Sequence, residues 1–351
     1  MGSTDPSDPI AAPDACSADF EGDYSLTLHV AAVFILMGVS FTGTVLPIIG
    51  KKYCNMNFGD LPFQSLKLFG AGVILATALV HMYSPAQSTL TSPCLPQVFQ
   101  DYGSWAGVIA LVGMFFTHLV QVVGISILRR RHMLPSLPTS DDSKPRPTST
   151  RSGLETSIPG GQGDMDIEVH SIHSHSPAHA DRAHFHSFVL ADAEKTLTTH
   201  ILEAGIASHS IIVGLTLGVA RAEFGSVLVA LCFHQLFEGL ALSTVVMDAN
   251  FEKRAMAFGM VTFYSLTTPV GIALGIGLRE TFNDSATSTL IVIGVLDSLS
   301  AGILLYDGLV NIVVPHFASE RFKMGSAKQS LVQFLVMWLG AGVMALIGRW
   351  A

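Results

Sequence analysis

Long apolar stretches, each followed by a short polar segment, dominate the pattern of this sequence. An α-helix rises about 1.5 Å per residue and a bilayer core is about 30 Å thick, so about 20 apolar residues span it. Eight stretches approach or exceed this length: Leu26 to Ile49, Leu66 to Tyr83, Trp105 to Leu128, Leu197 to Ala220, Gly225 to Val246, Ala255 to Leu278, Thr289 to Val314 and Leu331 to Ile347. The pattern therefore predicts an all-α polytopic membrane protein with eight transmembrane helices.

The composition agrees with this prediction. Hydrophobic residues make up 49% of the 351 residues and charged residues only 13%, whereas soluble domains carry about 25% charged residues. The net charge is −8, which argues against a nucleic-acid partner. The four cysteines form no C-x-x-C pair, so neither a zinc knuckle nor a disulfide-dense scaffold is indicated.

Basic residues gather in the loops that follow the odd-numbered stretches. These loops hold Lys51, Lys52, Arg129, Arg130, Arg131, Lys253, Arg254, Arg321, Lys323 and Lys328. The loops after the even-numbered stretches have little beyond Arg221 and Arg279. Because cytoplasmic loops carry an excess of Lys and Arg, we expect both termini to be extracellular or lumenal.

This orientation has a consequence for the cysteines. Cys16 and Cys94 fall on the same oxidising side, whereas Cys54 falls in the cytosol and Cys232 inside a helix. A disulfide between Cys16 and Cys94 is permitted on that side. Two free thiols would give the same sequence, so both alternatives stay open.

The longest interruption lies between the third and fourth stretches. The chain divides into an acidic extracellular tail (residues 1–25), helices one to three (26–128), this loop (129–196) and helices four to eight (197–351). The loop is rich in Ser, Pro, Thr, Gly and Asp, which predicts a disordered cytosolic segment. Near its end it holds His170, His173, His175, His179, His184 and His186. Since imidazole binds zinc-like ions, we expect this loop to capture metal, with a plain polar linker as the alternative.

Two ionisable residues interrupt the fifth stretch. His234 and Glu238 stand four residues apart, which is about 40° around a helix, so both point to one side. An ionisable group costs about 2.5–3.5 kcal/mol at the centre of a membrane helix and needs a reason to be there. One nitrogen with carboxylate oxygens suits Zn²⁺ or Fe²⁺ better than Mg²⁺ or Ca²⁺. The stretch therefore predicts part of a transition-metal site, with Gln235 as a weaker oxygen donor.

The fourth stretch supplies a counterpart. His209 lies near its middle and Ser210 follows it, so two neighbouring helices can close one site. The predicted ligands are His209, Ser210, His234, Gln235 and Glu238. A lone buried histidine often only hydrogen-bonds a carbonyl, and Glu238 could simply pair with His234. The occurrence of these residues in consecutive stretches favours the metal site.

With these residues in view, the chain resembles the ZIP (Zrt/Irt-like) family of zinc and iron uptake transporters. The matching segments end at His81 in the second stretch and run from Glu203 to Gly214 and from His234 to Gly239 in the fourth and fifth. Thr267 to Gly277 and Ser298 to Gly302 extend the match. The resemblance implies that the five predicted ligands line the transport site of the family.

The sequence departs from the family pattern at two positions. Val213 stands where members with two adjacent metals have a glutamate, which argues for one metal ion or a weakened second site. Asn311 stands where similar members often have an acid, and Asp307, one turn earlier, is the candidate to take over its pathway role. His81, His118 and Gln121 are further pathway candidates.

The prediction for function is transport of a divalent transition metal, zinc or iron, into the cytosol. The ion is then substrate, and no tightly bound cofactor is expected. A membrane-embedded zinc hydrolase and a non-transporting metal sensor are the alternatives from other classes. We expect a multi-pass protein of the lipid bilayer, in the plasma membrane rather than an organelle, and the small-residue helix faces make a homodimer plausible.

Overall fold

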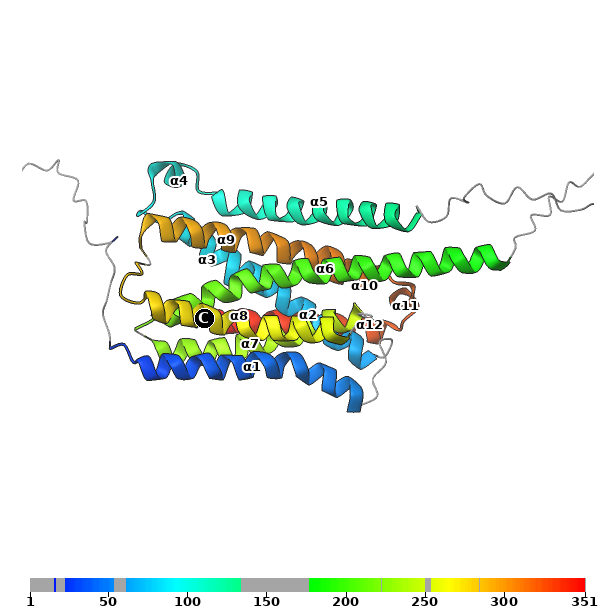
Figure 1. Cartoon of the computed structure of the whole chain (residues 1–351), viewed down its shortest axis with the longest axis horizontal. Coiled ribbons are helices and arrows are strands. Elements are labelled where there is room, and N and C mark those ends of the chain that lie inside the picture. The colour runs from blue at the N-terminus through cyan, green and yellow to red at the C-terminus, as the bar shows by residue number, and fades with distance from the viewer. Residues whose placement is uncertain are drawn as a thin grey trace, which may run out of the picture.

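The computed structural model describes residues 16, 23–53, 61–133, 177–221, 223–249, 254–283 and 285–350. In these ranges the chain is built from helices, with no β-strand (Figure 1). The helices are α1 (Leu26–Tyr53), α2 (Leu61–Ala76), η1 (Thr77–Tyr83), α3 (Ser84–Leu90), α4 (Gln97–Asp101), α5 (Trp105–Met133), α6 (Pro177–Val219), α7 (Phe224–Asp248), α8 (Arg254–Leu278), α9 (Thr287–Tyr306), η3 (Asp307–Val313), α10 (Val314–Ala318), α11 (Glu320–Lys323) and α12 (Ala327–Ile347).

Eight spans in the described residues are long and apolar enough to cross a membrane, which confirms the predicted all-α, eight-helix class. The second span combines α2, η1 and α3 (Leu61–Leu90), and the seventh combines α9, η3 and α10 (Thr287–Ala318). The fourth helix is longer than the sequence pattern indicated. It begins at Pro177, inside the segment that the apolar pattern assigned to the loop, and most of that loop lies outside the described residues.

Both composite spans contain a turn of π-helix, η1 and η3. Such turns are rare and occur frequently at functional sites. In this chain they carry candidate pathway residues: His81 lies on η1, and Asp307 and Asn311 lie on η3. The wider turn therefore occurs in both spans where polar side chains enter the interior.

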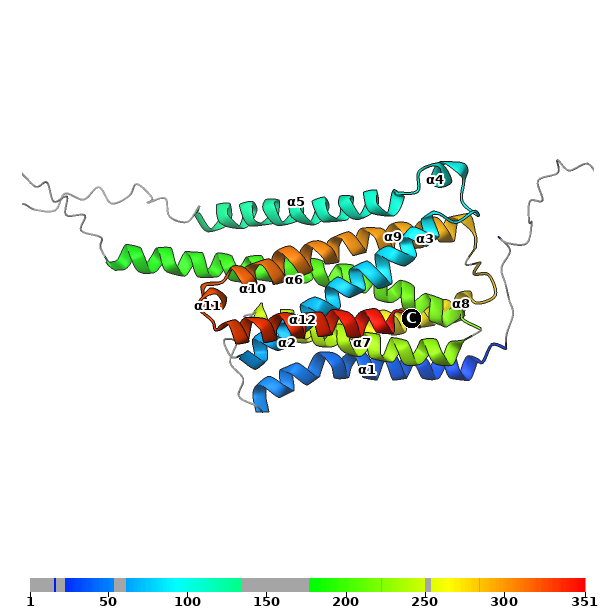
Figure 2. The same cartoon turned by 180° about the vertical axis from the view of Figure 1, so that it is seen from behind.

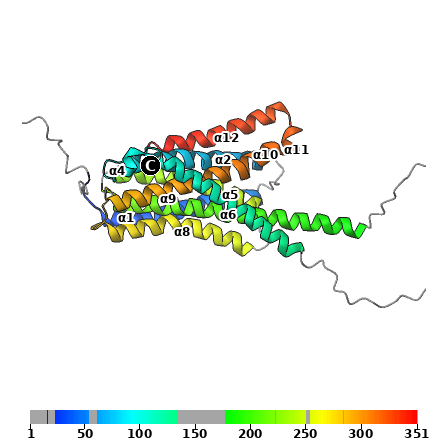
Figure 3. The same cartoon turned by 90° about the horizontal axis from the view of Figure 1, so that it is seen from above.

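The spans pack as two groups. In the first bundle, defined as α1, α6, α7 and α8, the most extensive contacts join α6 with α8 and α1 with α7. In the second bundle, defined as α2 with η1 and α3, α5, α9 with η3, and α12, they join α2 with α12 and α5 with α9. Figures 2 and 3 show α12 beside α2 on the side of the molecule away from α8. The bundles meet mainly where α2 packs on α7 and α6 packs on α9.

Glycines allow the closest approach inside the first bundle. Gly214 and Gly218 of α6 face Gly271 and Gly275 of α8, and a Cβ at any of the four would collide with the backbone of the facing helix. Small residues of this kind let membrane helices pack closely by van der Waals contact. The helix that carries His209 is therefore firmly held against α8.

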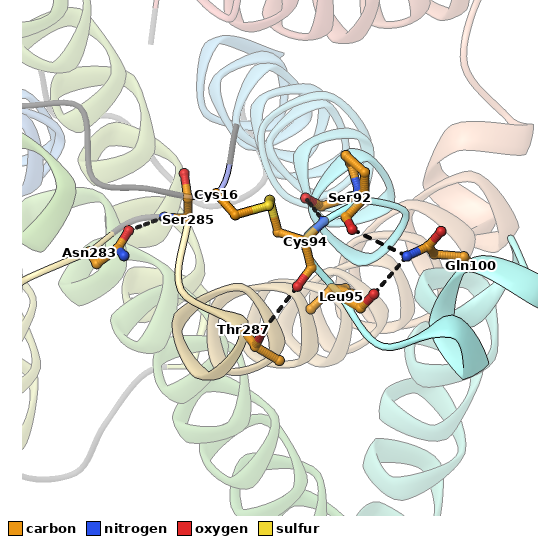
Figure 4. Close-up of a disulfide and its surroundings, with 9 residues drawn as sticks. Cys16, Ser92, Cys94, Leu95, Gln100, Asn283, Ser285 and Thr287 are labelled. Atoms are coloured by element: carbon orange, nitrogen blue, oxygen red, sulfur yellow. Dashed lines mark hydrogen bonds between the residues drawn. A yellow bond between two sulfur atoms is a disulfide. The ribbon is translucent and has the colours of Figure 1, made fainter. Parts of the chain in front are cut away.

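A disulfide joins Cys16 to Cys94 across a sequence separation of 78 residues (Figure 4). Of the two alternatives that the sequence left open, the structure has the bonded one. Thr287 holds the same loop, since its hydroxyl donates to the carbonyl oxygen of Cys94 over 3.0 Å. Cys16 precedes α1 of the first bundle, and Cys94 follows α3 of the second bundle and precedes α4. This bond therefore connects the two bundles at the end where α4 lies (Figure 1).

Candidate metal site

The helix α7 brings its three predicted residues into the interior. His234, Gln235 and Glu238 are each only 1% exposed. The four-residue spacing places the first and last on one side, with 3.6 Å between His234 Nε2 and Glu238 Oε2. The predicted shared face is therefore confirmed, and neither side chain faces lipid.

The helix α6 presents His209 and Ser210 to the same interior, where they are 2% and 1% exposed. The ring centres of His209 and His234 lie 5.7 Å apart. His209 Nδ1 lies 3.3 Å from Oδ1 of Asp297 on α9. The fourth and fifth spans thus converge as the sequence predicted.

A third imidazole joins from the second bundle. The ring centre of His81, on η1, lies 5.0 Å from that of His234. His81 Nε2 donates to the carbonyl oxygen of Met344 on α12 over 2.8 Å, so Nδ1 carries no proton when this ring is neutral. The sequence suggested His81 only as a pathway candidate, whereas the structure places it directly beside the predicted ligands.

These ring separations suit a shared ion. Two imidazoles that bind one Zn²⁺ ion through bonds of about 2.0–2.1 Å have ring centres about 5–6 Å apart. Among the described residues, however, no three His, Cys, Asp or Glu side chains already stand around one point in ligand geometry. The arrangement is a set of nearby donors that would have to turn toward an ion, and it is not a preformed cage.

The donors share one further property: each has at least one buried polar atom without a hydrogen-bond partner. The atoms concerned are His209 Nε2, Ser210 Oγ, His234 Nδ1 and Nε2, and Glu238 Oε1. A buried polar atom without a hydrogen bond costs about 1–3 kcal/mol. We name these four residues the donor cluster. A concentration of unpaired donors in one buried place is what a site for a cation requires.

Gln235 differs from the donor cluster because its amide is already engaged. Its Nε2 donates to Ser40 Oγ on α1 over 3.1 Å and to Thr268 Oγ1 on α8 over 2.5 Å. The buried Tyr264 hydroxyl on α8 donates to the backbone carbonyl oxygen of Gln235 over 2.9 Å and lies 3.4 Å from Glu238 Oε2. These contacts tie α7 to the rest of the first bundle and fix the direction of the Gln235 amide.

A second buried polar group, the amide–carboxylate cluster, consists of Asp307, Asn311 and Gln121. Asp307 is fully buried, and its Oδ1 accepts from Asn311 Nδ2 over 2.5 Å and from Gln121 Nε2 over 3.3 Å. Its Oδ2 has no partner. His118 lies apart from this cluster, with an exposed ring whose Nδ1 lies 2.8 Å from the Tyr306 hydroxyl.

Two cavities of about 530 and 490 Å³ lie at the end of the molecule where α11 is found. Asn311 lines both of them, and His118 and Gln121 line the second. They also share Lys67 and Asp248, which form an ion pair of 2.7 Å between α2 and α7. The amide–carboxylate cluster therefore adjoins open space that leads away from the buried helices.

Two buried carboxylates were not predicted from the sequence to be site residues. Asp297 on α9 and Glu203 on α6 are each 5% exposed, and Glu203 Oε1 has no partner. The signal was available, because a carboxylate inside an apolar run is rare and needs a reason. The loop residues His170, His173 and His175 lie outside the described residues. Nothing is described of the side chains of His179, His184 and His186, which belong to α6.

Comparison with known proteins agrees with this picture. The family model described as ZIP Zinc transporter matches residues 26–348. The chain is 31% identical to zinc transporter 3 of Oryza sativa subsp. japonica over 350 residues, which cover 95% of this chain and 91% of that protein. It is 31% identical to zinc-regulated transporter 2 of Saccharomyces cerevisiae, and the match covers 96% of this chain and 97% of that protein. It is 30% identical to Fe(2+) transport protein 3, chloroplastic, of Arabidopsis thaliana, and the match covers 96% of this chain and 88% of that protein.

Proposed function

Because the chain belongs to the ZIP zinc transporter family, we propose that it carries a divalent transition metal ion, zinc with iron as the second candidate, across a membrane into the cytosol. The observation that carries this proposal is the donor cluster: five buried polar atoms of His209, Ser210, His234 and Glu238 have no protein partner. The relatives named above are called a zinc transporter, a zinc-regulated transporter and an Fe(2+) transport protein. None of these names is that of a hydrolase or a sensor, so transport stands above both alternatives.

In this proposal His209, His234 and Glu238 are the principal ligands. The Ser210 hydroxyl and the side-chain amide oxygen (Oε1) of Gln235 are weaker donors. Two nitrogens and a carboxylate form a borderline set that favours Zn²⁺ or Fe²⁺ over Mg²⁺ and Ca²⁺. Since Val213 offers no donor, we propose one ion at this site. His81 then lies close enough to His234 for the ion to pass between the two imidazoles.

These ligands also set an expectation for pH. A metal ion binds neutral imidazole and ionised carboxylate, so binding competes with protons. We expect affinity to fall as the pH is lowered through the range in which imidazole takes up a proton. The ion is substrate, and the site must release it, which suits three principal ligands better than a closed cage of four thiolates.

The route to the cytosol would pass the amide–carboxylate cluster. Asp307 then supplies the carboxylate that is absent at position 311, where this chain has an asparagine. The two cavities beside Asn311 form the exit. The excess of basic residues in the loops at this end supports a cytosolic position for it. The disulfide between Cys16 and Cys94 supports the same orientation, since such bonds persist on oxidising sides. The loop histidines would hold metal close to the exit.

The plasma membrane is the proposed location, although one relative carries the word chloroplastic in its name. A homodimer, with small-residue helix faces at its interface, is proposed as well. Fractionation of cells that express the tagged chain would decide the membrane. Crosslinking in native membranes would test the dimer.

The function is tested by uptake of Zn²⁺, Fe²⁺ and Mg²⁺ into proteoliposomes that hold the purified chain. We expect uptake of the first two, and loss of that uptake in His209→Ala. His200→Ala is the matched control, because His200 lies on the same helix, is exposed and hydrogen-bonds the Thr196 carbonyl oxygen. Uptake by His209→Ala at the rate of the unmodified chain would overturn the proposed site.

A further inference from the structure

Asp297 is a buried carboxylate that the proposed ligand set does not use. It lies in the middle of α9, is 5% exposed, and its Oδ1 lies 3.3 Å from His209 Nδ1. Within the described part of the chain, His209 is the polar partner found for this side chain. A carboxylate in the interior of a membrane helix costs about 2.5–3.5 kcal/mol. The position of Asp297 beside His209 therefore needs a functional reason.

The geometry fixes what the contact does to the imidazole. An ionised carboxylate only accepts hydrogen bonds, so the proton of a neutral His209 ring must lie on Nδ1. Nε2 then carries the free electron pair. That nitrogen is buried and has no partner, and the ring centre of His234 lies 5.7 Å from that of His209. A histidine that binds a metal commonly gives its other N–H to a carboxylate, which fixes the ring and makes it a stronger ligand.

We propose that Asp297 is a positioning residue for the transported ion: it holds His209 in the tautomer and orientation that present Nε2 to a divalent cation. This proposal rests on the proposed function, since it assumes that His209 is a ligand. Asp297 is not itself a ligand of that ion, because its oxygen faces Nδ1 and the ion would lie beyond Nε2.

The contact also crosses between the two bundles. His209 belongs to α6 of the first bundle and Asp297 to α9 of the second. A neighbouring hydrogen bond joins the same helices, with 2.5 Å between the hydroxyl oxygens of Ser208 and Ser300. Any movement that separates α6 from α9 would remove Asp297 from His209. The ion would then be held more tightly in the bundle arrangement of this structure than after such a movement.

The experiment measures the Kd for Zn²⁺ by titration of the purified full chain, together with the KM and maximal rate of uptake in proteoliposomes. Asp297→Leu removes the acceptor while roughly keeping the size of the side chain. Loss of such a partner costs about 10- to 100-fold in metal affinity, and we expect KM to rise with a smaller change in the maximal rate. Asp297→Asn retains an oxygen that can accept from Nδ1, so its Kd should lie nearer that of the unmodified chain.

Ser300→Ala is the matched control, because it breaks the neighbouring hydrogen bond between α6 and α9 without removing an atom of His209 or Asp297. Its Kd should stay within about twofold of the unmodified value, since the loss of one neutral hydrogen bond has a small net effect. The positioning role is overturned if Asp297→Leu binds Zn²⁺ as the unmodified chain does, or if Ser300→Ala weakens binding as much as Asp297→Leu.

The double variant His209→Ala/Asp297→Leu separates this inference from the proposed function. If Asp297 acts through His209, the second substitution adds no further loss to that of His209→Ala alone. Full loss in His209→Ala with an unchanged Kd in Asp297→Leu would defeat the positioning role and leave the transport site intact. Unchanged binding in His209→Ala would instead defeat the site itself.

Discussion

The donor cluster and the amide–carboxylate cluster are both buried and polar, yet their hydrogen bonding is opposite. In the first, five atoms of four residues have no partner. In the second, two amides converge on one oxygen of Asp307 and leave only Oδ2 free. Unpaired donors raise the energy of the empty protein and so favour an ion that can pair them. A carboxylate already held by amides binds an ion more weakly, which suits passage rather than capture.

The largest effect that this comparison predicts is at Glu238. Glu238→Ala removes the one charged ligand and the only carboxylate of the donor cluster, and we expect the Kd for Zn²⁺ to rise by more than about 100-fold, beyond the cost of losing an outer partner. Uptake should be abolished while the protein remains in the membrane. Titration measures the Kd, proteoliposome assays measure uptake, and surface labelling measures the amount of protein in the membrane.

Glu203→Gln is a suitable comparison for that variant, because Glu203 is another buried carboxylate with an unpaired oxygen and lies on α6, six residues from His209. Its Kd should change far less. Equal losses of binding in both variants would mean that total buried charge matters, and that the donor cluster is not a specific site.

A smaller effect is expected at the amide–carboxylate cluster. Asp307→Asn should lower the maximal uptake rate by about tenfold, the equivalent of ~1.4 kcal/mol in the barrier, with little change in Kd. The double variant Asp307→Asn/Asn311→Asp restores a carboxylate one turn away on the same helix face. We expect it to regain much of the rate.

Proteoliposome kinetics give the maximal uptake rate of Asp307→Asn, of Asn311→Asp and of the double variant. A maximal rate in Asp307→Asn equal to that of the unmodified chain would show that the ion does not depend on this carboxylate. Failure of the double variant to recover would show that position 307 cannot be exchanged for position 311.

The sequence predicts those features of the two clusters that arise within one helix, and it does not predict those that arise from packing between helices. The shared face of His234 and Glu238 follows from helical periodicity alone, and it was predicted. The approach of His81 to His234 depends on how α2 and its π-helical turn pack against α7, and no local pattern reports that. Asp297 was visible as an acid in an apolar run, but its partner on another helix was not.

Two other features illustrate the same limit. The pairing of Cys16 with Cys94 needed the relative position of two loops, which topology permits but does not determine. The start of α6 at Pro177 lies in a polar segment, where the apolar pattern that marks a membrane span is missing. The spans could be predicted because burial in lipid demands long apolar runs, whereas contacts between helices obey no rule of comparable strength.

The smallest effect, and the finest test of the comparison, is at Ser210. Its hydroxyl is an unpaired but neutral and weak donor, so Ser210→Ala should raise the KM for Zn²⁺ by about two- to fourfold, which corresponds to less than ~1 kcal/mol. Ser243→Ala is the matched control, because Ser243 Oγ is equally buried and unpaired but lies about 13 Å from His234 along α7. If the unpaired state alone determined the effect, both variants would change KM alike. If the donor cluster is the place where the ion binds, only Ser210→Ala changes it, and uptake kinetics of the two proteins side by side distinguish these outcomes.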